Sequence, residues 1–253
     1  MQDLLEVRNL GVSCGGRPVL HDICFKLPEK SVTSIVGPSG VGKTTLLRAI
    51  NRLLEESGQY HVTGEVLLRH KLPGGRVMNR YELRRKIGLV FQKPTIFPVS
   101  IYKNVIFGAR HVAPVSRKEY SVLVEKCLRD SFLWEEVRDR LGEPARQLSV
   151  GQQQRLAISR TLAVSPDILM MDEPTASLDA KATSQIEKLI LRLGKTKSVF
   201  FVTHDPEQAV AISDQIVVLN PTQKGAEAKV LRGHPDFKGF LASYQREGSN
   251  AAF

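Results

Sequence analysis

Residues 37–44 read Gly37-Pro38-Ser39-Gly40-Val41-Gly42-Lys43-Thr44. This stretch fits the pattern G-x-x-x-x-G-K-[ST], in which glycines let consecutive backbone N–H groups converge on phosphate oxygens at the start of a helix. A β-rich run over 31–36 comes directly before it, and apolar residues with helical spacing follow over 45–50. Strand, loop and helix thus follow in the order that a phosphate-binding loop requires. The alternative is a glycine-rich turn that fits this pattern by chance. Each further motif described below argues against it.

The last residues of this stretch carry its chemistry. Lys43 is predicted to reach the terminal phosphates of a nucleotide. Thr44 is predicted to supply a hydroxyl to Mg²⁺, which prefers phosphates, one or two protein oxygens and water. Thr45 completes the predicted nucleotide-binding set. No Asn-Lys-x-Asp segment of the kind that reads guanine is present, so we expect ATP rather than GTP.

The composition limits the class of protein. The chain has 253 residues, 42% of them apolar and 25% charged, which is ordinary for a soluble globular protein. It has no run of 18 apolar residues and no apolar leader, so we expect it neither to span a membrane nor to be exported. Cys14, Cys24 and Cys127 form no C-x-x-C pair, so no metal role is expected for them. The net charge of +10 would suit nucleic acid, but the basic residues are spread out without interleaved aromatic residues, and no nucleic-acid partner is expected.

The hydrophobic pattern changes twice along the chain. Short strands are predicted in the N-terminal third, at 4–10, 19–27, 31–36, 62–68 and 86–91. Helices are predicted in the middle, at 101–110, 117–130 and 133–140. The two then alternate, with helices at 149–163, 180–193 and after 206, and strands at 167–171, 198–203 and 214–219. Such alternation favours a parallel sheet covered by helices on both faces.

We therefore expect a single α/β domain. Its core is predicted at about 1–92 and 156–222, with a helical subdomain inserted at about 93–155. A C-terminal extension is predicted at about 223–253, ending in a frayed tail from 248 onward.

Asp172 and Glu173 close the apolar strand over 167–171, so they lie at the edge where open α/β sheets bind their ligands. Asp172 fits as a partner of Mg²⁺, and Glu173 as the base that deprotonates a water attacking the γ-phosphate. His204 follows another strand and is predicted to hold the γ-phosphate or that water. Gln92 follows a third strand and is predicted to reach Mg²⁺ or water through its amide oxygen. The plainer alternatives are a helix cap, a structural histidine and a surface amide before a turn.

A further motif spans residues 148–155, which read Leu148-Ser149-Val150-Gly151-Gln152-Gln153-Gln154-Arg155. Ser149 is expected to cap a helix whose start is similar to a second phosphate-binding helix terminus. With the loop at 37–44, Gln92, the segment at 177–179 and His204, this order of motifs resembles the ATP-binding subunits of ABC transporters over about residues 3–220. Segments 91–105 and 133–141 resemble the ATPases of phosphate-specific importers in particular.

This resemblance implies a P-loop NTPase (RecA-like) core with an N-terminal antiparallel β subdomain and an inserted α-helical subdomain. It implies an ATPase that works as a homodimer, in which ATP lies between the phosphate loop of one chain and four residues of the other, namely Ser149, Gly151, Gln152 and Asp179. It also implies two transmembrane permease subunits and, indirectly, an extracytoplasmic solute-binding protein, which would place the chain at the cytoplasmic face of the cell membrane.

The resemblance implies inorganic phosphate as the imported solute, with another small oxyanion or a polar amino acid as the alternative. The rival from a different class is a soluble ABC ATPase that acts on nucleic acid or ribosomes. A single domain without an inserted coiled coil argues against that rival.

The sequence departs from the family pattern at two positions. Val150 replaces the first glycine usual in the signature motif, but Gly151, whose N–H is expected to approach the γ-phosphate, is retained. Cys14 stands where the family usually has an aromatic residue that stacks on adenine, and no aromatic residue precedes His21. The alternative for Cys14 is that it merely ends an edge strand. The apolar run at 97–101 is expected to contact the permease, with packing against the chain's own helices as the alternative.

Overall fold

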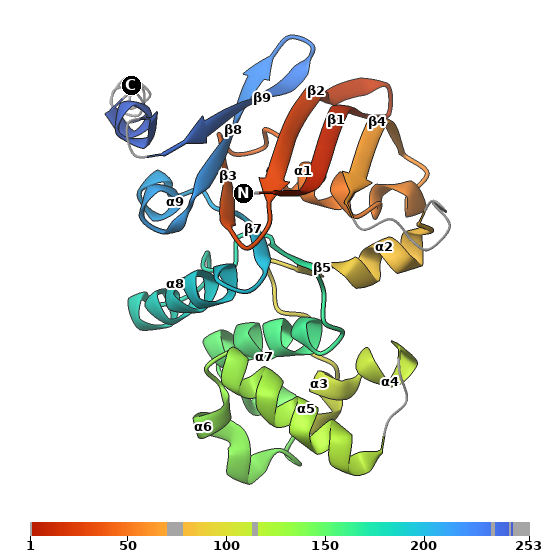
Figure 1. Ribbon diagram of the computed structural model, residues 1–253, viewed down its shortest axis with the longest axis vertical. Coiled ribbons are helices and arrows are strands. Elements are labelled where there is room, and N and C mark those ends of the chain that lie inside the picture. The colour runs from red at the N-terminus through yellow and green to blue at the C-terminus, as the bar shows by residue number, and fades with distance from the viewer. Residues whose placement is uncertain (1, 70–77, 113–115, 234–235, 243, 245–253) are drawn as a thin grey trace.

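The computed structural model describes residues 2–69, 78–112, 116–233, 236–242 and 244. In this part of the chain, nine strands form one sheet in the order β4-β1-β2-β9-β8-β3-β7-β6-β5 (Figure 1). The strands are β1 (Asp3–Cys14), β2 (Arg17–Pro28), β3 (Val32–Val36), β4 (Tyr60–Leu68), β5 (Ile87–Val90), β6 (Ile168–Met171), β7 (Ser198–Val202), β8 (Gln215–Thr222) and β9 (Gly225–Arg232).

The sheet has a parallel half and an antiparallel half. Strands β5, β6, β7, β3 and β8 run parallel to their neighbours within that series. Strand β1 is antiparallel to both β2 and β4, and β8 is antiparallel to β9. One residue pair, Leu20 with Ala226, joins β2 to β9 and makes the sheet continuous. Cys14 does end a strand, but β1 lies between β4 and β2, so the alternative given for Cys14 is wrong in placing that strand at the edge of the sheet.

The described helices are unevenly distributed over the molecule (Figure 1). Helices α3 to α7 lie together at one end of the molecule, away from β1, β2 and β4 (Figure 1). The α-helices are α1 (Lys43–Ile50), α2 (Arg80–Lys86), α3 (Ile101–Ile106), α4 (Ala109–Val112), α5 (Arg117–Asp130), α6 (Trp134–Val137), α7 (Val150–Leu162), α8 (Ala180–Gly194) and α9 (Pro206–Ile212). Short 3₁₀ turns are η1 (Leu54–Glu56), η3 (Arg138–Arg140) and η4 (Ala145–Gln147). Every helix that the structure describes is too short or too polar to cross a lipid bilayer.

The central strands separate two hydrophobic cores. All residues of β3, β6 and β7 are buried, as expected for strands of a parallel sheet that is covered on both faces. Successive strand residues point to opposite faces. Met170 and Phe200 accordingly pack in the core that contains α1, whereas Met171 and Phe201 pack in the core that contains α5, α7 and α8. The phosphate-loop helix and the helical end of the molecule are therefore held on opposite sides of the same strands.

Some element boundaries differ from those predicted. The strand predicted from 86 begins at Ile87, because α2 occupies the preceding residues and ends at Lys86. The helix predicted over 133–140 is split into α6 and the 3₁₀ turn η3, and the helix over 101–110 is interrupted at Phe107 and Gly108. Strand β9 lies in the predicted C-terminal extension. The subdomain boundaries remain predictions, and the tail from 248 lies outside the described residues, as do 234–235, 243 and 245–247 of the extension.

Candidate functional site

The loop at 37–42 joins β3 to α1 at the carboxyl edge of the parallel strands. Its backbone has φ of 78° at Gly40 and 109° at Gly42, a region that favours glycine. Gly42 also has no room for a side chain, because a Cβ there would lie 2.9 Å from Cδ2 of Leu20. The turn into α1 therefore depends on glycine, as the loop pattern predicts.

Lys43 is folded onto this loop. Its Nζ donates hydrogen bonds to the carbonyl oxygens of Gly37 and Pro38, at 2.8 and 2.9 Å. Burial lowers the pKa of Lys43, and the nearby carboxylates of Glu173 and Asp172 oppose that shift. A partly desolvated ammonium that has only carbonyl partners is well placed to exchange them for phosphate oxygens.

Thr44 and Asp172 meet beside this ammonium. The Thr44 hydroxyl donates to Oδ1 of Asp172 at 2.8 Å, which brings the end of β6 against the start of α1. Asp172 is only 6% exposed. Burial raises the pKa of Asp172; the hydrogen bond from Thr44 opposes the rise, and the charge of Glu173 adds to it. These two predicted metal-binding residues are thus in direct contact around a desolvated carboxylate.

Two of the other predicted catalytic residues, Gln92 and His204, lie against Glu173. Gln92 Nε2 donates to Oε2 of Glu173 at 3.0 Å, and Nδ1 of His204 lies 3.7 Å from the same oxygen. The backbone of Glu173 has φ of 44°, an unusual conformation for a residue other than glycine and one that occurs often at functional sites. The ends of β5, β6 and β7 therefore bring one amide, one carboxylate and one imidazole together at the carboxyl edge of the sheet.

The residues predicted to act across a dimer form a separate group. Ser149 caps α7 by accepting from the backbone N–H of Gln152 at 3.3 Å, and Asp179 caps α8 by accepting from Ala182 at 2.8 Å. The two helix starts are adjacent, since a Cβ on Gly151 would lie 3.0 Å from Cβ of Ala182. Among the described residues, no hydrogen bond or ion pair links Ser149, Gln152 or Asp179 to Lys43, Thr44 or Glu173.

Comparison with known proteins identifies this arrangement. Residues 20–176 match the protein family described as ABC transporter. The chain is 44% identical to a phosphate import ATP-binding protein, PstB 1, of Yersinia pestis bv. Antiqua over 246 residues, 97% of this chain and 89% of the relative. The chain belongs to the ABC transporter family. It is similar to PstB of Shewanella denitrificans as well, with 44% identity over 83% of this chain and 78% of that one.

Solved structures agree with this assignment. The cbiO1 protein of Clostridium perfringens, part of the ABC transporter complex cbiONQ, has a TM-score of 0.76 and 29% identity, with 100% of this chain and 96% of that chain covered. A bacterial Atm1-family ABC exporter with ATP bound has a TM-score of 0.77 and 25% identity, covering 100% of this chain and 42% of the exporter chain. The predicted fold class and the predicted family are thus confirmed, and the chain is an ABC-type ATPase subunit.

One functional candidate in this ABC ATPase, Glu136, was not singled out from the sequence. Glu136 on α6 accepts hydrogen bonds from Gln152 and from the buried Arg155, both on α7. Glu136 lies in the segment 133–141, which served only to indicate the subfamily. Nothing in its local sequence shows that it reaches α7, because that contact depends on how two helices pack.

Residues of the apolar run at 97–101 pack largely against other parts of the same chain. Ile101 is 1% exposed, and the Phe97 ring lies between Phe107, at 4.3 Å between centroids, and the guanidinium of Arg160, at 4.4 Å. Packing against the chain's own helices, the alternative given above, accounts for these two residues. Phe107 itself is 47% exposed.

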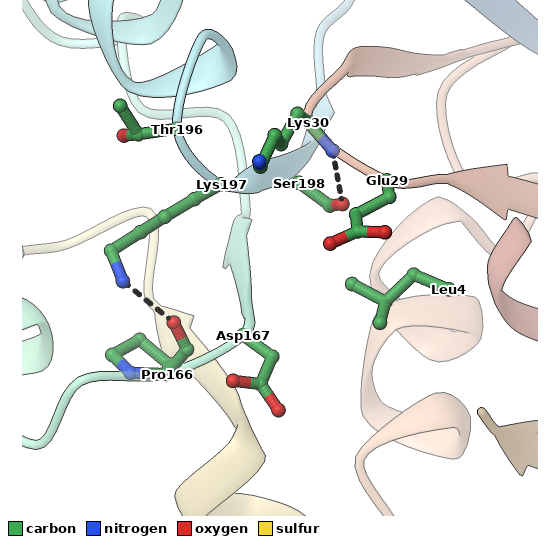
Figure 2. A pocket seen from close by; sticks show the side chains of 8 residues that line it. All are labelled: Leu4, Glu29, Lys30, Pro166, Asp167, Thr196, Lys197 and Ser198. Carbon is green, nitrogen blue, oxygen red and sulfur yellow. Dashed lines mark hydrogen bonds between the residues drawn. The ribbon is translucent and has the colours of Figure 1, made fainter. Parts of the chain in front are cut away.

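A small pocket of about 110 Å³ lies at the opposite edge of the sheet. It is lined where β6 and β7 begin, by residues that include Asp167, Lys197 and Ser198 (Figure 2). Lys197 Nζ donates to the carbonyl oxygen of Pro166 at 2.9 Å, and the backbone N–H of Lys30 donates to Oγ of Ser198 at 3.1 Å. None of the predicted site residues lines this pocket, and the nucleotide chemistry belongs to the carboxyl edge.

Proposed function

We propose that this chain is the ATP-hydrolysing subunit of a prokaryotic ABC importer for inorganic phosphate. The observation that carries the hydrolytic part is the convergence of Gln92 and His204 on Glu173, next to the phosphate loop. The two curated relatives reported above, at 44% identity, are named phosphate import ATP-binding proteins, which supports phosphate as the solute.

Binding of MgATP is assigned to the loop residues 37–45, to Asp172 and to Gln92. The donor set fits Mg²⁺, because Thr44 and Asp172 offer adjacent oxygens and Gln92 offers an amide oxygen. The raised pKa of Asp172 is what is expected of a buried carboxylate whose charge a cation would balance. When bound, Mg²⁺ supplies charge neutralisation at the phosphates. Lys43 exchanges the carbonyl oxygens of Gly37 and Pro38 for the terminal phosphates.

Hydrolysis is assigned to Glu173 as general base. Its Oε2 accepts a proton from the water that attacks the γ-phosphate, a role that contributes about 10²–10⁴-fold in rate. Gln92 and His204 lie against that same oxygen and orient the water and the γ-phosphate. With ATP bound, Gln92 turns its amide from Glu173 toward the nucleotide.

The working unit is a homodimer with two ATP molecules between its subunits. Ser149, Gly151, Gln152 and Asp179 of one chain face the phosphate loop of the other. The helix start formed by residues 149–152 is the part that meets the γ-phosphate, since unpaired N–H groups there favour an anion. The dimer lies at the cytoplasmic face of the membrane, and its closure switches two transmembrane permease subunits between inward- and outward-facing states. A solute-binding protein outside the cytoplasm delivers the solute to these subunits.

Another small oxyanion or a polar amino acid as the solute is the second candidate, because the residues assigned above act on the nucleotide and none of them selects the transported solute. The test is to co-purify the chain with its native permease, insert the complex into vesicles and measure ATP turnover with candidate solute-binding proteins. Stimulation by a phosphate-loaded binding protein is expected. Stimulation only by a binding protein loaded with another solute contradicts phosphate as the cargo, and stimulation by nucleic acid or ribosomes alone contradicts the importer.

A further inference from the structure

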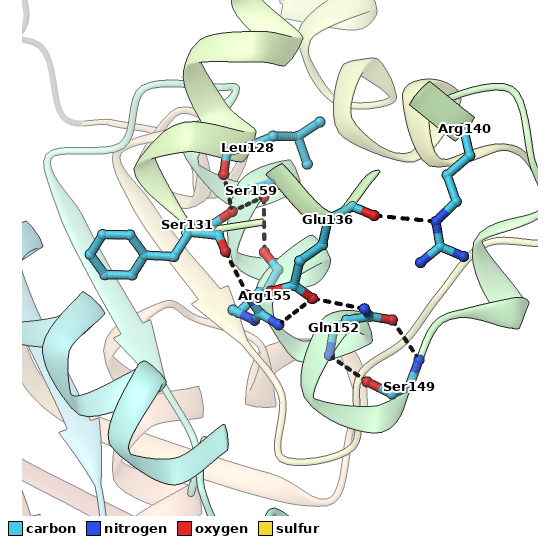
Figure 3. Close-up of polar contacts among 9 residues, drawn as sticks. Leu128, Ser131, Glu136, Arg140, Ser149, Gln152, Arg155 and Ser159 are labelled. Atoms are coloured by element: carbon cyan, nitrogen blue, oxygen red, sulfur yellow. Dashed lines mark hydrogen bonds and ion pairs between the residues drawn. The ribbon is translucent and has the colours of Figure 1, made fainter. Parts of the chain in front are cut away.

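Glu136 links α6 to the first turns of α7 through three hydrogen bonds (Figure 3). Arg155 Nη1 donates to Oε1 of Glu136 at 2.7 Å, and Arg155 Nη2 donates to Oε2 at 3.1 Å. Gln152 Nε2 donates to Oε2 at 2.8 Å. The Arg155 side chain is 5% exposed, so it is anchored in the interior, whereas Glu136 lies at the rim with 36% of its side chain exposed. The carboxylate thus connects a buried guanidinium to a residue of the signature motif.

Gln152 has both ends of its side-chain amide engaged within its own chain. Its Oε1 accepts from the backbone N–H of Ser149 at 3.0 Å, while Nε2 donates to Glu136 at 2.8 Å. A carboxylate can only accept, so Glu136 selects the amide orientation in which Oε1 faces Ser149. That orientation closes the capping box, in which Ser149 Oγ accepts from the N–H of Gln152. Ser149 Oγ keeps its own proton to donate outward.

The charge on Glu136 is maintained by these partners. Burial would raise the pKa of Glu136, but the hydrogen bonds from Arg155 and Gln152 outweigh it and hold the pKa below its ordinary value. Arg155 in turn donates to the carbonyl oxygen of Phe132 and has no other carboxylate partner among the described residues. The first turn of α7 is therefore tied to a carboxylate whose charged form is favoured.

We propose that Glu136 is a positioning residue for ATP-dependent dimerisation: it fixes Gln152 and the start of α7, so that Ser149 and Gly151 are presented to the partner's nucleotide. Gln152 is then the link between Glu136 and this helix start. This inference rests on the proposed function, in which that helix start meets ATP held by the other subunit. Ser149 and Val150 are exposed, as such a contact surface requires.

The experiment uses full-length chains that carry Glu173→Gln to slow hydrolysis, and measures MgATP-dependent dimerisation by analytical ultracentrifugation. Glu136→Gln keeps the shape of the side chain but replaces one of its two accepting oxygens by an amide donor. That donor lies against Arg155 in either orientation of the amide, and against Nε2 of Gln152 in one of them. The matched control is Glu135→Gln, because Glu135 is 64% exposed and pairs with Arg129 and Arg138 at the surface. Binding of a fluorescent ATP analogue, at protein concentrations too low for dimers, reports on the phosphate loop alone.

Glu136→Gln is expected to weaken the dimer at least tenfold, while Glu135→Gln and the ATP affinity of the monomer change less than twofold. The double variant Glu136→Gln with Gln152→Glu exchanges amide and carboxylate and preserves net charge, so it is expected to restore most of the dimer affinity. If Glu136→Gln does not fold, Gln152→Ala cuts the same link while leaving the pair of Glu136 and Arg155 intact, and is expected to weaken the dimer similarly.

Three results overturn the positioning role. They are a dimer as tight with Glu136→Gln as with Glu135→Gln, an equal loss of monomer ATP affinity and dimer affinity, or a double variant that binds ATP normally but stays impaired, which would show that the bond between Glu136 and Gln152 is not what the dimer needs. If neither the Glu173→Gln parent nor its control dimerises with MgATP, the proposed dimeric function itself fails.

Discussion

Replacing Gly42 by alanine should destabilise the fold more than the same change at Gly40, although both glycines lie in one loop. Their φ angles are 109° and 78°. A side chain in left-handed backbone costs about 1–2 kcal/mol, and that cost applies to both positions. At Gly42 the new methyl would also lie 2.9 Å from Cδ2 of Leu20, which is only 2% exposed, and 3.2 Å from Cγ1 of Val19. Overpacking of this kind adds about 1–3 kcal/mol.

At Gly40 nothing lies within 4 Å of the added methyl. We therefore expect a loss of about 2–5 kcal/mol for Gly42→Ala and of about 1–2 kcal/mol for Gly40→Ala. Urea unfolding measures both free energies, and unchanged m values would show that the comparison is sound. Equal losses for the two variants would refute the claim that Leu20 and Val19 leave no room for a side chain at Gly42.

Three further changes test other parts of the site. Lys43→Ala should weaken ATP binding itself, and an unchanged affinity in calorimetry would argue against the phosphate-loop assignment. Cys14→Tyr should tighten ATP binding, by up to about 1–3 kcal/mol, if this position faces the adenine; an equal change for ribose triphosphate would show that the ring does not meet the base. Burial raises the pKa of the Cys127 thiol to about 12, so it stays protonated at pH 8 and should resist alkylation in the native protein while the exposed Cys24 reacts. Rapid labelling of Cys127 would contradict this.

The elements that could be predicted are those with strong local patterns. The strand at 167–171 and the helix over 117–130 appear within one residue of their predicted bounds, because apolar runs and helical spacing decide them locally. Helix α2 was missed although Asn79 and Glu82 form a capping box, since the basic residues that follow obscured the pattern. Strand β9 has alternating charged residues and gains its order from pairing with β8, a contact that the sequence pattern does not show.

The residues of the candidate site divide in the same way, into those that local position predicts and those that depend on how distant elements pack. Lys43, Asp172 and Glu173 could be assigned because each stands at a strand end or helix start whose position in a parallel sheet is set by topology. Gln92 and His204 were also assigned from their positions after strands. Their contact with one oxygen of Glu173 requires three strand ends to be neighbours, which the sequence pattern does not show. Glu136 could not be found, because its bond to Gln152 crosses between two separate helices.

The role of Glu173 is tested most directly by Glu173→Gln, assayed for MgATP binding, dimerisation and hydrolysis in one preparation. The amide keeps the size of the side chain and its contact with Gln92 but cannot take a proton from water. ATP binding is expected to remain, an ATP-bound dimer should accumulate on size exclusion, and turnover should fall by about 10²-fold or more. A variant that hydrolyses ATP at a rate near that of the unmodified protein would contradict the assignment of Glu173 as the general base.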